Sequence, residues 1–205
     1  MMQYGSGRSQ QPEKPTEKLL QLQKEAAGCS LCDLRKTCSQ VVFGEGNFST
    51  RLMLVGEGPG AEEDRLGRPF VGRAGQLLDR ILAAAEIKRE DVYITNVVKC
   101  RPPSNRLPLQ PEVDACYPYL KAQIELINPA IILCLGALAT RTLYDKNAAI
   151  TRVRGQWKEK DGRRILATFH PAALLRDPKK KKPAWEDFKK IMAVYHNTQK
   201  EAADE

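Results

Sequence analysis

The sequence has few aromatic residues, very few histidines and no long hydrophobic segment. Aromatic residues make up 6% of its 205 residues, and only two residues are histidines. The longest strongly apolar run, residues 130–139, is far too short to cross a bilayer, and the first residues show no signal-peptide pattern. No internal repeat is visible. These absences argue against a membrane-spanning or secreted protein, so we expect a soluble, cytoplasmic protein with no membrane partner.

The length and charge of the chain indicate one domain with a basic surface. A chain of 205 residues is large enough to form its own core. We expect a single ordered domain over residues 16–197, preceded by a disordered arm at 1–15 that is rich in Gln, Ser, Gly and Pro, and followed by a frayed C-terminus at 198–205. The net charge of +8 indicates either a polyanionic partner or simply a solubilising surface.

Apolar runs and helical patterns divide the chain into expected elements. Strands or strand-like runs are predicted at residues 52–55, 91–98, 130–135, 150–158 and 163–169. Helices are predicted at residues 16–27, 76–85 and about 112–127, and in a final segment where Trp185, Phe188, Ile191 and Val194 recur at helical spacing. This final stripe is typical of a core-facing helix.

The most informative stretch is a glycine-rich turn that follows the strand at 52–55. Gly56 and Gly58 allow the backbone to approach a ligand closely. The turn formally matches the dinucleotide pattern G-x-G-x-x-A, but the three acids at 62–64 would repel a pyrophosphate at a helix start. The acid about 20 residues further on, Asp79, lies in a helical pattern instead of ending a second strand. A carboxylate-bearing active-site turn fits this stretch better than a nucleotide-binding loop.

Six cysteines without a secretion pattern favour a metal, a cluster or free thiols over disulfides. A C-x2-C pair on one turn can reach the same ion, whereas a redox role is disfavoured because no thioredoxin-like strand precedes it. Four cysteine thiolates, this pair and two from later in the chain, could bind either a structural zinc ion or an iron–sulfur cluster. Spacing alone favours zinc. Cys38 is a weaker candidate, and Cys134 lies in an apolar strand as an expected inert thiol. The four candidate ligands are Cys29, Cys32, Cys100 and Cys116.

Three further residues stand where chemistry is expected. Phe70 lies in a glycine-punctuated loop between two arginines, where it could stack on a base or pack the loop onto the core. Asn96 ends an apolar strand, where an amide needs partners and could offer one donor and one acceptor to a ligand. His170 lies where a strand gives way to a loop, and either a structural or a functional histidine fits there.

Four motifs in register carry a resemblance to a known family. Residues 56–60, 67–72, 95–103 and 170–176, together with the cysteine pattern, closely resemble the family 4 uracil-DNA glycosylases over residues 16–193. The resemblance implies an α/β fold, a three-layer α/β/α sandwich around a mainly parallel four-stranded sheet. It implies monofunctional removal of uracil from DNA, which leaves an abasic site. It also implies a [4Fe-4S] cluster, with a structural role, on the four cysteines named above.

The resemblance also implies how uracil is bound. A uracil inside a duplex cannot be reached, so the nucleotide must flip into a pocket. Gly56 and Gly58 would line this pocket, and Phe70 would stack on the base. Asn96 would read the Watson–Crick edge, with its carbonyl accepting from N3–H and its amide donating to O4. Cytosine presents the opposite pattern and would be rejected.

The remaining roles concern catalysis. His170 would donate to uracil O2 and stabilise the developing anion. Glu57 or Glu63 would orient the water or stabilise the cationic sugar. The two are equal candidates, because Gly58 stands where the best-known branch of the superfamily has its water-activating aspartate. The basic, histidine-containing insertion of the covalently trapping relatives is missing, so we expect turnover.

Basic residues near these motifs are candidate contacts to the DNA backbone, which position the substrate without specifying sequence. The lysine run at 179–182 is either a solvated face or a further contact. The expected partner is uracil-containing DNA, single- or double-stranded, bound by a monomer. The four candidates are Lys99, Arg101, Arg106 and Arg176.

Two other classes of protein compete with a glycosylase. A non-catalytic iron–sulfur module that binds nucleic acid would explain the charge, the cysteines and Phe70. An electron-transfer protein would explain the cysteines alone. Neither class needs Asn96 and His170 at strand ends that face the same loop, so these two residues separate the glycosylase from both rivals.

Overall fold

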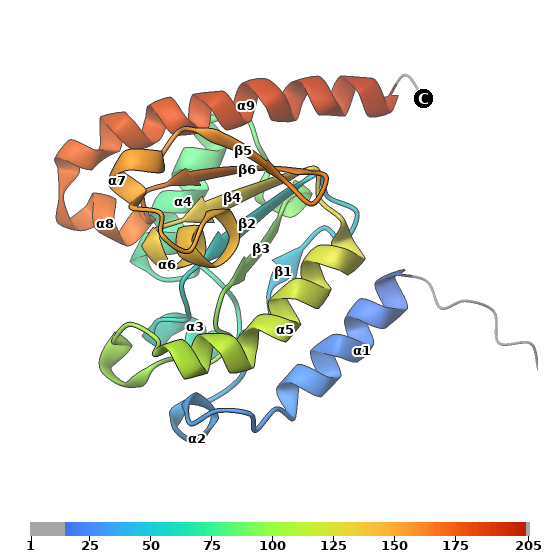
Figure 1. The fold of residues 1–205 in the computed structure, drawn as a ribbon, viewed down its shortest axis with the longest axis vertical. Helices are drawn as coiled ribbons and strands as arrows, with labels where there is room; N and C mark the ends of the chain where they lie inside the picture. The colour runs from blue at the N-terminus through green and yellow to red at the C-terminus, as the bar shows by residue number, and fades with distance from the viewer. Residues whose placement is uncertain (1–14, 204–205) are drawn as a thin grey trace, which may run out of the picture.

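The computed structural model describes residues 15–203, with side chains described up to residue 197. Of the expected disordered arm at residues 1–15, only Pro15 is described, and it begins helix α1; residues 1–14 and 204–205 lie outside the described part. Figure 1 shows a central sheet between two layers of helices, which is the predicted α/β/α sandwich. No helix in residues 15–203 is both long and apolar enough to cross a membrane.

The sheet has six strands in the order β1-β3-β2-β4-β6-β5. Its four inner strands run parallel, and the two outer strands pair antiparallel with their neighbours. The prediction of a mainly parallel, four-stranded sheet is correct for the inner strands and wrong for the total. The edge strands are short and only partly buried, so they leave little hydrophobic pattern in the sequence. The strands are β1 (Glu45–Gly46), β2 (Leu52–Gly56), β3 (Tyr93–Asn96), β4 (Ile131–Leu135), β5 (Trp157–Lys160) and β6 (Arg163–Thr168).

The α-helices connect the parallel strands and close both faces of the sheet. They are α1 (Pro15–Ala27), α2 (Leu34–Thr37), α3 (Ala61–Leu66), α4 (Arg73–Ala84), α5 (Gln110–Ile127), α6 (Ala137–Ala139), α7 (Ile150–Val153), α8 (Pro171–Arg176) and α9 (Lys181–Ala203). Short 3-10 or π turns lie at η1 (Arg89–Asp91), η2 (Pro103–Asn105), η3 (Thr140–Tyr144) and η4 (Pro178–Lys180).

Two differences from the predicted elements have simple physical causes. The segment predicted as a strand at 150–158 begins instead as helix α7, because Ile150 and Val153 are spaced for one helix face and both pack against the core. Helix α9 continues to Ala203, past the expected end of the domain at residue 197.

Each face of the sheet has its own apolar core. Met53 and Val55 pack with side chains of α1, α5 and α6, whereas Leu52 and Leu54 pack with side chains of α4 and α9. Every residue of β2 is buried, as it is in β4, because helices cover both faces of the parallel strands. The parallel strands all end at one edge of the sheet, which therefore gathers the polar residues that follow them.

Candidate active site

A cleft of about 540 Å³ lies at the carboxyl edge of the parallel strands. Its walls come from the glycine turn after β2, the loop before α4, the end of β3, the loop before α5 and the start of α8. Segments far apart in the sequence therefore meet at one site. The predicted site residues that line the cleft are Glu57, Gly58, Glu63, Phe70, Asn96, Arg106, His170 and Arg176.

Asn96 ends β3 with an unpaired acceptor. The residue is 1% exposed, and its Oδ1 atom accepts no hydrogen bond from any described residue. A buried amide oxygen without a partner costs free energy unless a ligand supplies the donor. Gly56 lies directly beside it, and a Cβ at Gly56 would overlap both Asn96 Oδ1 and the Phe70 ring. The glycine therefore keeps open the space between the amide and the ring.

Phe70 lines the same cleft, and its backbone has a strained conformation. Its φ of 52° is left-handed, which is unfavourable for a bulky side chain. The ring is buried, and its centroid lies 5.4 Å from that of the His170 ring at a tilt of 31°. Phe70 therefore packs its loop onto the core, as one of the two sequence interpretations predicts, and its ring also lines the cleft.

Glu63 binds the two glycine loops together. Its Oε1 accepts hydrogen bonds from the backbone N–H of Val71 at 3.0 Å and of Gly72 at 2.9 Å. Its Oε2 accepts from the N–H of Gly60 at 3.1 Å. Both carboxylate oxygens are thus engaged by backbone amides, and these bonds hold the loop that carries Phe70.

Glu57 lies directly after β2 in a different environment. Its side chain makes no hydrogen bond to another described residue, and it is partly buried in the cleft. Burial raises the pKa of the Glu57 carboxyl, while the nearby positive charges of Arg141 and Arg176 oppose this shift. This carboxylate is the one left free to face a ligand.

His170 caps the N-terminus of α8. Its Nδ1 accepts a hydrogen bond from the Ala172 N–H at 3.1 Å, so in the neutral ring the proton is on Nε2. The pKa of His170 is lowered to about 4, chiefly by burial and also by the positive charge of Arg176, while the charge of Glu63 opposes the shift. The ring is therefore a neutral hydrogen-bond donor at pH 7.

The four residues predicted to contact the DNA backbone differ in their surroundings. Arg106 and Arg176 line the cleft, and Arg106 also forms two hydrogen bonds of 2.8 and 2.6 Å with Glu112. Arg101 is partly exposed and donates to Asn105. The prediction for Lys99 is wrong: this residue is 2% exposed and its ammonium is enclosed by protein acceptors, so it cannot reach a DNA phosphate.

Sequence reasoning missed one wall of the cleft. In the proline-rich segment after Cys100 only arginines are predicted as site residues, as candidate DNA contacts, yet Pro102, Asn105, Leu107 and Pro108 also line the cleft. Leu107 is 64% exposed. The available signal was the position of the segment directly after the strand that ends at Asn96, because such loops border the ligand site of a parallel sheet.

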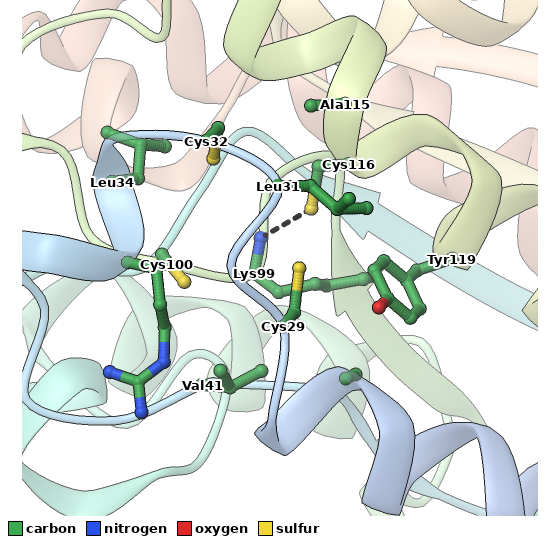
Figure 2. Close-up of a pocket in the computed structure, with 12 residues that line it drawn as sticks. Cys29, Leu31, Cys32, Leu34, Val41, Lys99, Cys100, Ala115, Cys116 and Tyr119 are labelled. Atoms are coloured by element: carbon green, nitrogen blue, oxygen red, sulfur yellow. Dashed lines mark hydrogen bonds between the residues drawn. The ribbon is translucent and has the colours of Figure 1, made fainter.

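The four predicted cysteine ligands line one small pocket, shown in Figure 2. Cys29 and Cys32 come from the segment between α1 and α2, Cys100 follows β3, and Cys116 lies in α5. All six cysteines have free thiols. Cys116 Sγ accepts a hydrogen bond from the Lys99 backbone N–H at 3.3 Å. Apart from Arg35 and Lys99, the other side chains around the pocket are apolar or aromatic, as Figure 2 shows for Leu31, Leu34, Val41 and Tyr119.

The side chains of this pocket, four thiols among mostly apolar neighbours, are donors of the kind that hold a structural zinc or an iron–sulfur cluster. Within residues 15–203, no three cysteine, histidine or acidic side chains converge on one point that could hold a single ion. The two remaining cysteines are buried; burial raises the pKa of Cys134 to about 12, as expected for an inert thiol.

Comparisons with known proteins agree with this geometry. The family model of the uracil DNA glycosylase superfamily matches residues 43–189, and the chain belongs to that superfamily. It is 51% identical over 166 residues to a type-4 uracil-DNA glycosylase of Thermotoga maritima, covering 78% of this chain and 85% of the relative. A type-4 enzyme of Archaeoglobus fulgidus is 44% identical over 185 residues (85% and 92% covered), and one of Saccharolobus solfataricus is 46% identical over 176 residues (82% and 82%). Within the superfamily the chain thus belongs to the type-4 branch, which confirms the resemblance drawn from its motifs.

Proposed function

We propose that this uracil-DNA glycosylase binds a flipped nucleotide in the cleft and hydrolyses its N-glycosidic bond, releasing uracil and leaving an abasic site. The observation that carries this mechanism is the unpaired, buried Oδ1 of Asn96, which shares the cleft with the Phe70 ring and the neutral His170. Extraction of a base from a duplex costs roughly a few kcal/mol, which contacts in the pocket must offset.

In this proposal Asn96 reads the base. Its Oδ1 accepts a hydrogen bond from uracil N3–H, and its Nδ2 donates to O4, while Phe70 stacks on the ring. Cytosine has an acceptor at N3 and a donor at C4, so its binding would leave buried polar groups of both partners unpaired. Sites that hydrogen-bond a substrate in this way can discriminate by about 10⁴-fold or more.

Cleavage of the C1′–N1 bond leaves its electron pair on uracil and makes the sugar oxocarbenium-like. His170 Nε2–H donates to uracil O2, where negative charge develops, as a preorganised electrostatic stabiliser. Glu57 faces the cationic sugar and orients the water whose oxygen bonds to C1′; one proton of this water leaves and balances the charge of the uracil anion. Glu63 holds Phe70 and the glycine turn in position through its three backbone hydrogen bonds.

Arg101, Arg106 and Arg176 are proposed to contact DNA phosphates around the cleft. The proposal includes action as a monomer, which size-exclusion chromatography with and without a DNA oligonucleotide would check. It also includes activity in the cytoplasm, on single- or double-stranded DNA that contains uracil.

The four-cysteine pocket is proposed to hold a [4Fe-4S] cluster on Cys29, Cys32, Cys100 and Cys116. A bound cluster supplies four iron–thiolate bonds that cross-link three segments of the chain. The backbone N–H of Lys99 supports this proposal, because a donor pointed at a sulfur stabilises a thiolate ligand.

The experiment that tests the function uses an oligonucleotide with one uracil, incubated with the protein and then treated with alkali. We expect strand scission at the uracil and none where thymine or cytosine replaces it. Removal of a single preorganised donor typically costs about 100- to 1,000-fold, so His170→Ala should slow excision by that factor. A protein that binds this DNA and leaves it intact would instead favour the non-catalytic binding module.

A further inference from the structure

Lys99 is an unusual residue because its charge is buried. Among residues 15–197 it is the only lysine or arginine that is buried, with 2% of its surface exposed. Burial of a charge costs several kcal/mol unless hydrogen bonds compensate, so the position needs a physical reason. The residue stands between Asn96, which ends β3, and Cys100, which lines the cysteine pocket.

The ammonium of Lys99 has a complete set of acceptors. It donates to Thr95 Oγ1 at 2.6 Å, to the backbone carbonyl of Asn96 at 2.7 Å and to Gln123 Oε1 at 2.6 Å. An ammonium has three donors, so all are used. Gln123 in turn donates to the Phe43 carbonyl at 2.9 Å and to the Tyr93 hydroxyl at 3.0 Å. The network therefore fixes the end of β3 against α5 and the chain before β1.

The backbone of Lys99 belongs to the cysteine site. Its N–H donates to Cys116 Sγ at 3.3 Å, and its carbonyl accepts from the Val42 N–H at 2.8 Å. The two residues before it, Val97 and Val98, donate to the carbonyls of Gly56 and Glu57 at 2.9 and 3.1 Å. The segment from Asn96 to Cys100 is thus held along its whole length between the glycine turn and the cysteine pocket.

The direction of the Asn96 side chain depends on this backbone. Because no described residue hydrogen-bonds its Oδ1, the orientation of the amide before substrate arrives is set by its packing and by the peptide group that Lys99 holds. We propose that Lys99 is a positioning residue, which couples the four-cysteine site to the uracil-reading amide by binding the Asn96 carbonyl through its ammonium and Cys116 through its backbone. This inference rests on the proposed role of Asn96 in reading uracil.

The first experiment compares two substitutions within one buried network. Lys99→Met removes the bond to the Asn96 carbonyl, whereas the control Gln123→Met disrupts the same network and keeps that bond. A misplacement of about 1 Å can cost on the order of 100-fold in rate, so we expect Lys99→Met to slow single-turnover excision by about 10- to 100-fold. Free uracil should inhibit this variant less well by a similar factor. Gln123→Met should lower the melting temperature and change the rate by less than about 3-fold.

A double-mutant cycle with Asn96→Ala separates positioning from general damage. If Lys99 acts through Asn96, Lys99→Met should change the rate by less than about 3-fold when Asn96 is already alanine. Equal losses in both backgrounds would overturn the inference, as would a wild-type rate and uracil affinity in Lys99→Met alone. Asn96→Ala with wild-type activity would instead refute the proposed function.

Iron and acid-labile sulfide per chain supply a readout besides activity. We expect wild-type content in Lys99→Met, because its backbone donor to Cys116 remains. If Lys99→Met instead loses iron and its excision rate falls only by the same fraction, the positioning role would be contradicted. If Lys99→Met does not fold, the double variant Lys99→Met/Gln123→Met is used instead of it in the double-mutant cycle. This double variant replaces both hydrogen-bonding partners by apolar side chains, so neither is left buried without its partner.

Discussion

The two glutamates of the glycine turn show how strongly local contacts decide a residue's role. The sequence offers Glu57 and Glu63 as equal candidates, six residues apart in one acidic stretch. In the structure the Glu63 carboxylate accepts three backbone hydrogen bonds, whereas that of Glu57 makes none to described residues and faces the cleft. The structure thus supports Glu57 for the reaction and Glu63 for the shape of the site.

Substitution of each glutamate by glutamine should therefore have a different effect. Glu57→Gln removes the negative charge near the sugar, so we expect the single-turnover rate to fall at least about 10-fold while the melting temperature stays near that of the wild type. Glu63→Gln leaves one amide oxygen for three N–H donors and should destabilise the fold by about 1.5–3 kcal/mol. Thermal melting and single-turnover excision on both variants check this. The reverse pattern would assign the catalytic carboxylate to Glu63.

The imidazole of His170 gives the fold a defined dependence on pH. Its pKa is about 4 in the folded chain, against an ordinary value of about 6.5. Below pH 6.5 the unfolded chain therefore takes up a proton that the folded chain does not. This contribution to stability is present above pH 6.5 and decreases as the pH falls toward 4.

Comparison of wild type with His170→Gln tests this shift. Between pH 7 and pH 5 the wild type should lose about 2 kcal/mol more of its free energy of unfolding than the variant, because only the wild type carries this histidine. Denaturant titration at both pH values measures the difference. Equal losses in the two proteins would show that His170 titrates at its ordinary pKa and is charged at mildly acidic pH.

At the scale of elements, the cysteine pocket brings together segments of the chain that are not paired with one another in the central sheet. The segment after α1, the segment after β3 and helix α5 meet there (Figure 2). Helix α1 otherwise contacts the body of the domain through apolar residues such as Leu19 and Ala26. A cross-link at this point would hold α1 and α2 against α5.

Cys116→Ser should remove this cross-link and Cys134→Ala should not. We expect Cys116→Ser to lose iron and sulfide and to melt at a lower temperature, because bound metal contributes directly to folding free energy. The control removes a thiol buried in β4, outside the pocket, and should keep its iron. Full iron content in Cys116→Ser would show that Cys116 is not a ligand.

The parallel core and the site could be predicted because their signals are local. β2, β3 and β4 lie within short apolar runs, Gly56 and Asn96 each end a strand, and His170 follows β6 by two residues. Strand β1 was missed because it has only two residues, and only the first two residues of β5 fall within the run predicted at 150–158 because the rest of β5 is charged. Lys99 was misassigned because a lysine beside arginines and prolines looks exposed, and nothing in its neighbours along the chain reveals the acceptor on Gln123, which comes from α5.

At the scale of the whole molecule, the sandwich places one cleft at one edge of the sheet. The cleft contains an amide with a free acceptor, an aromatic wall, a neutral imidazole and a carboxylate, with Arg106 and Arg176 at its border. The net charge of +8 suits a polyanionic substrate. Fold, site and family therefore agree on a single activity.

The most direct test of this account is the quantity of free base released from an oligonucleotide with one uracil. The account predicts that free uracil appears in equal amount to alkali-labile sites, that the strand stays intact until alkali is added, and that a cytosine oligonucleotide releases no base. Strand breakage before alkali, or abasic sites without free uracil, would contradict hydrolytic removal of the base.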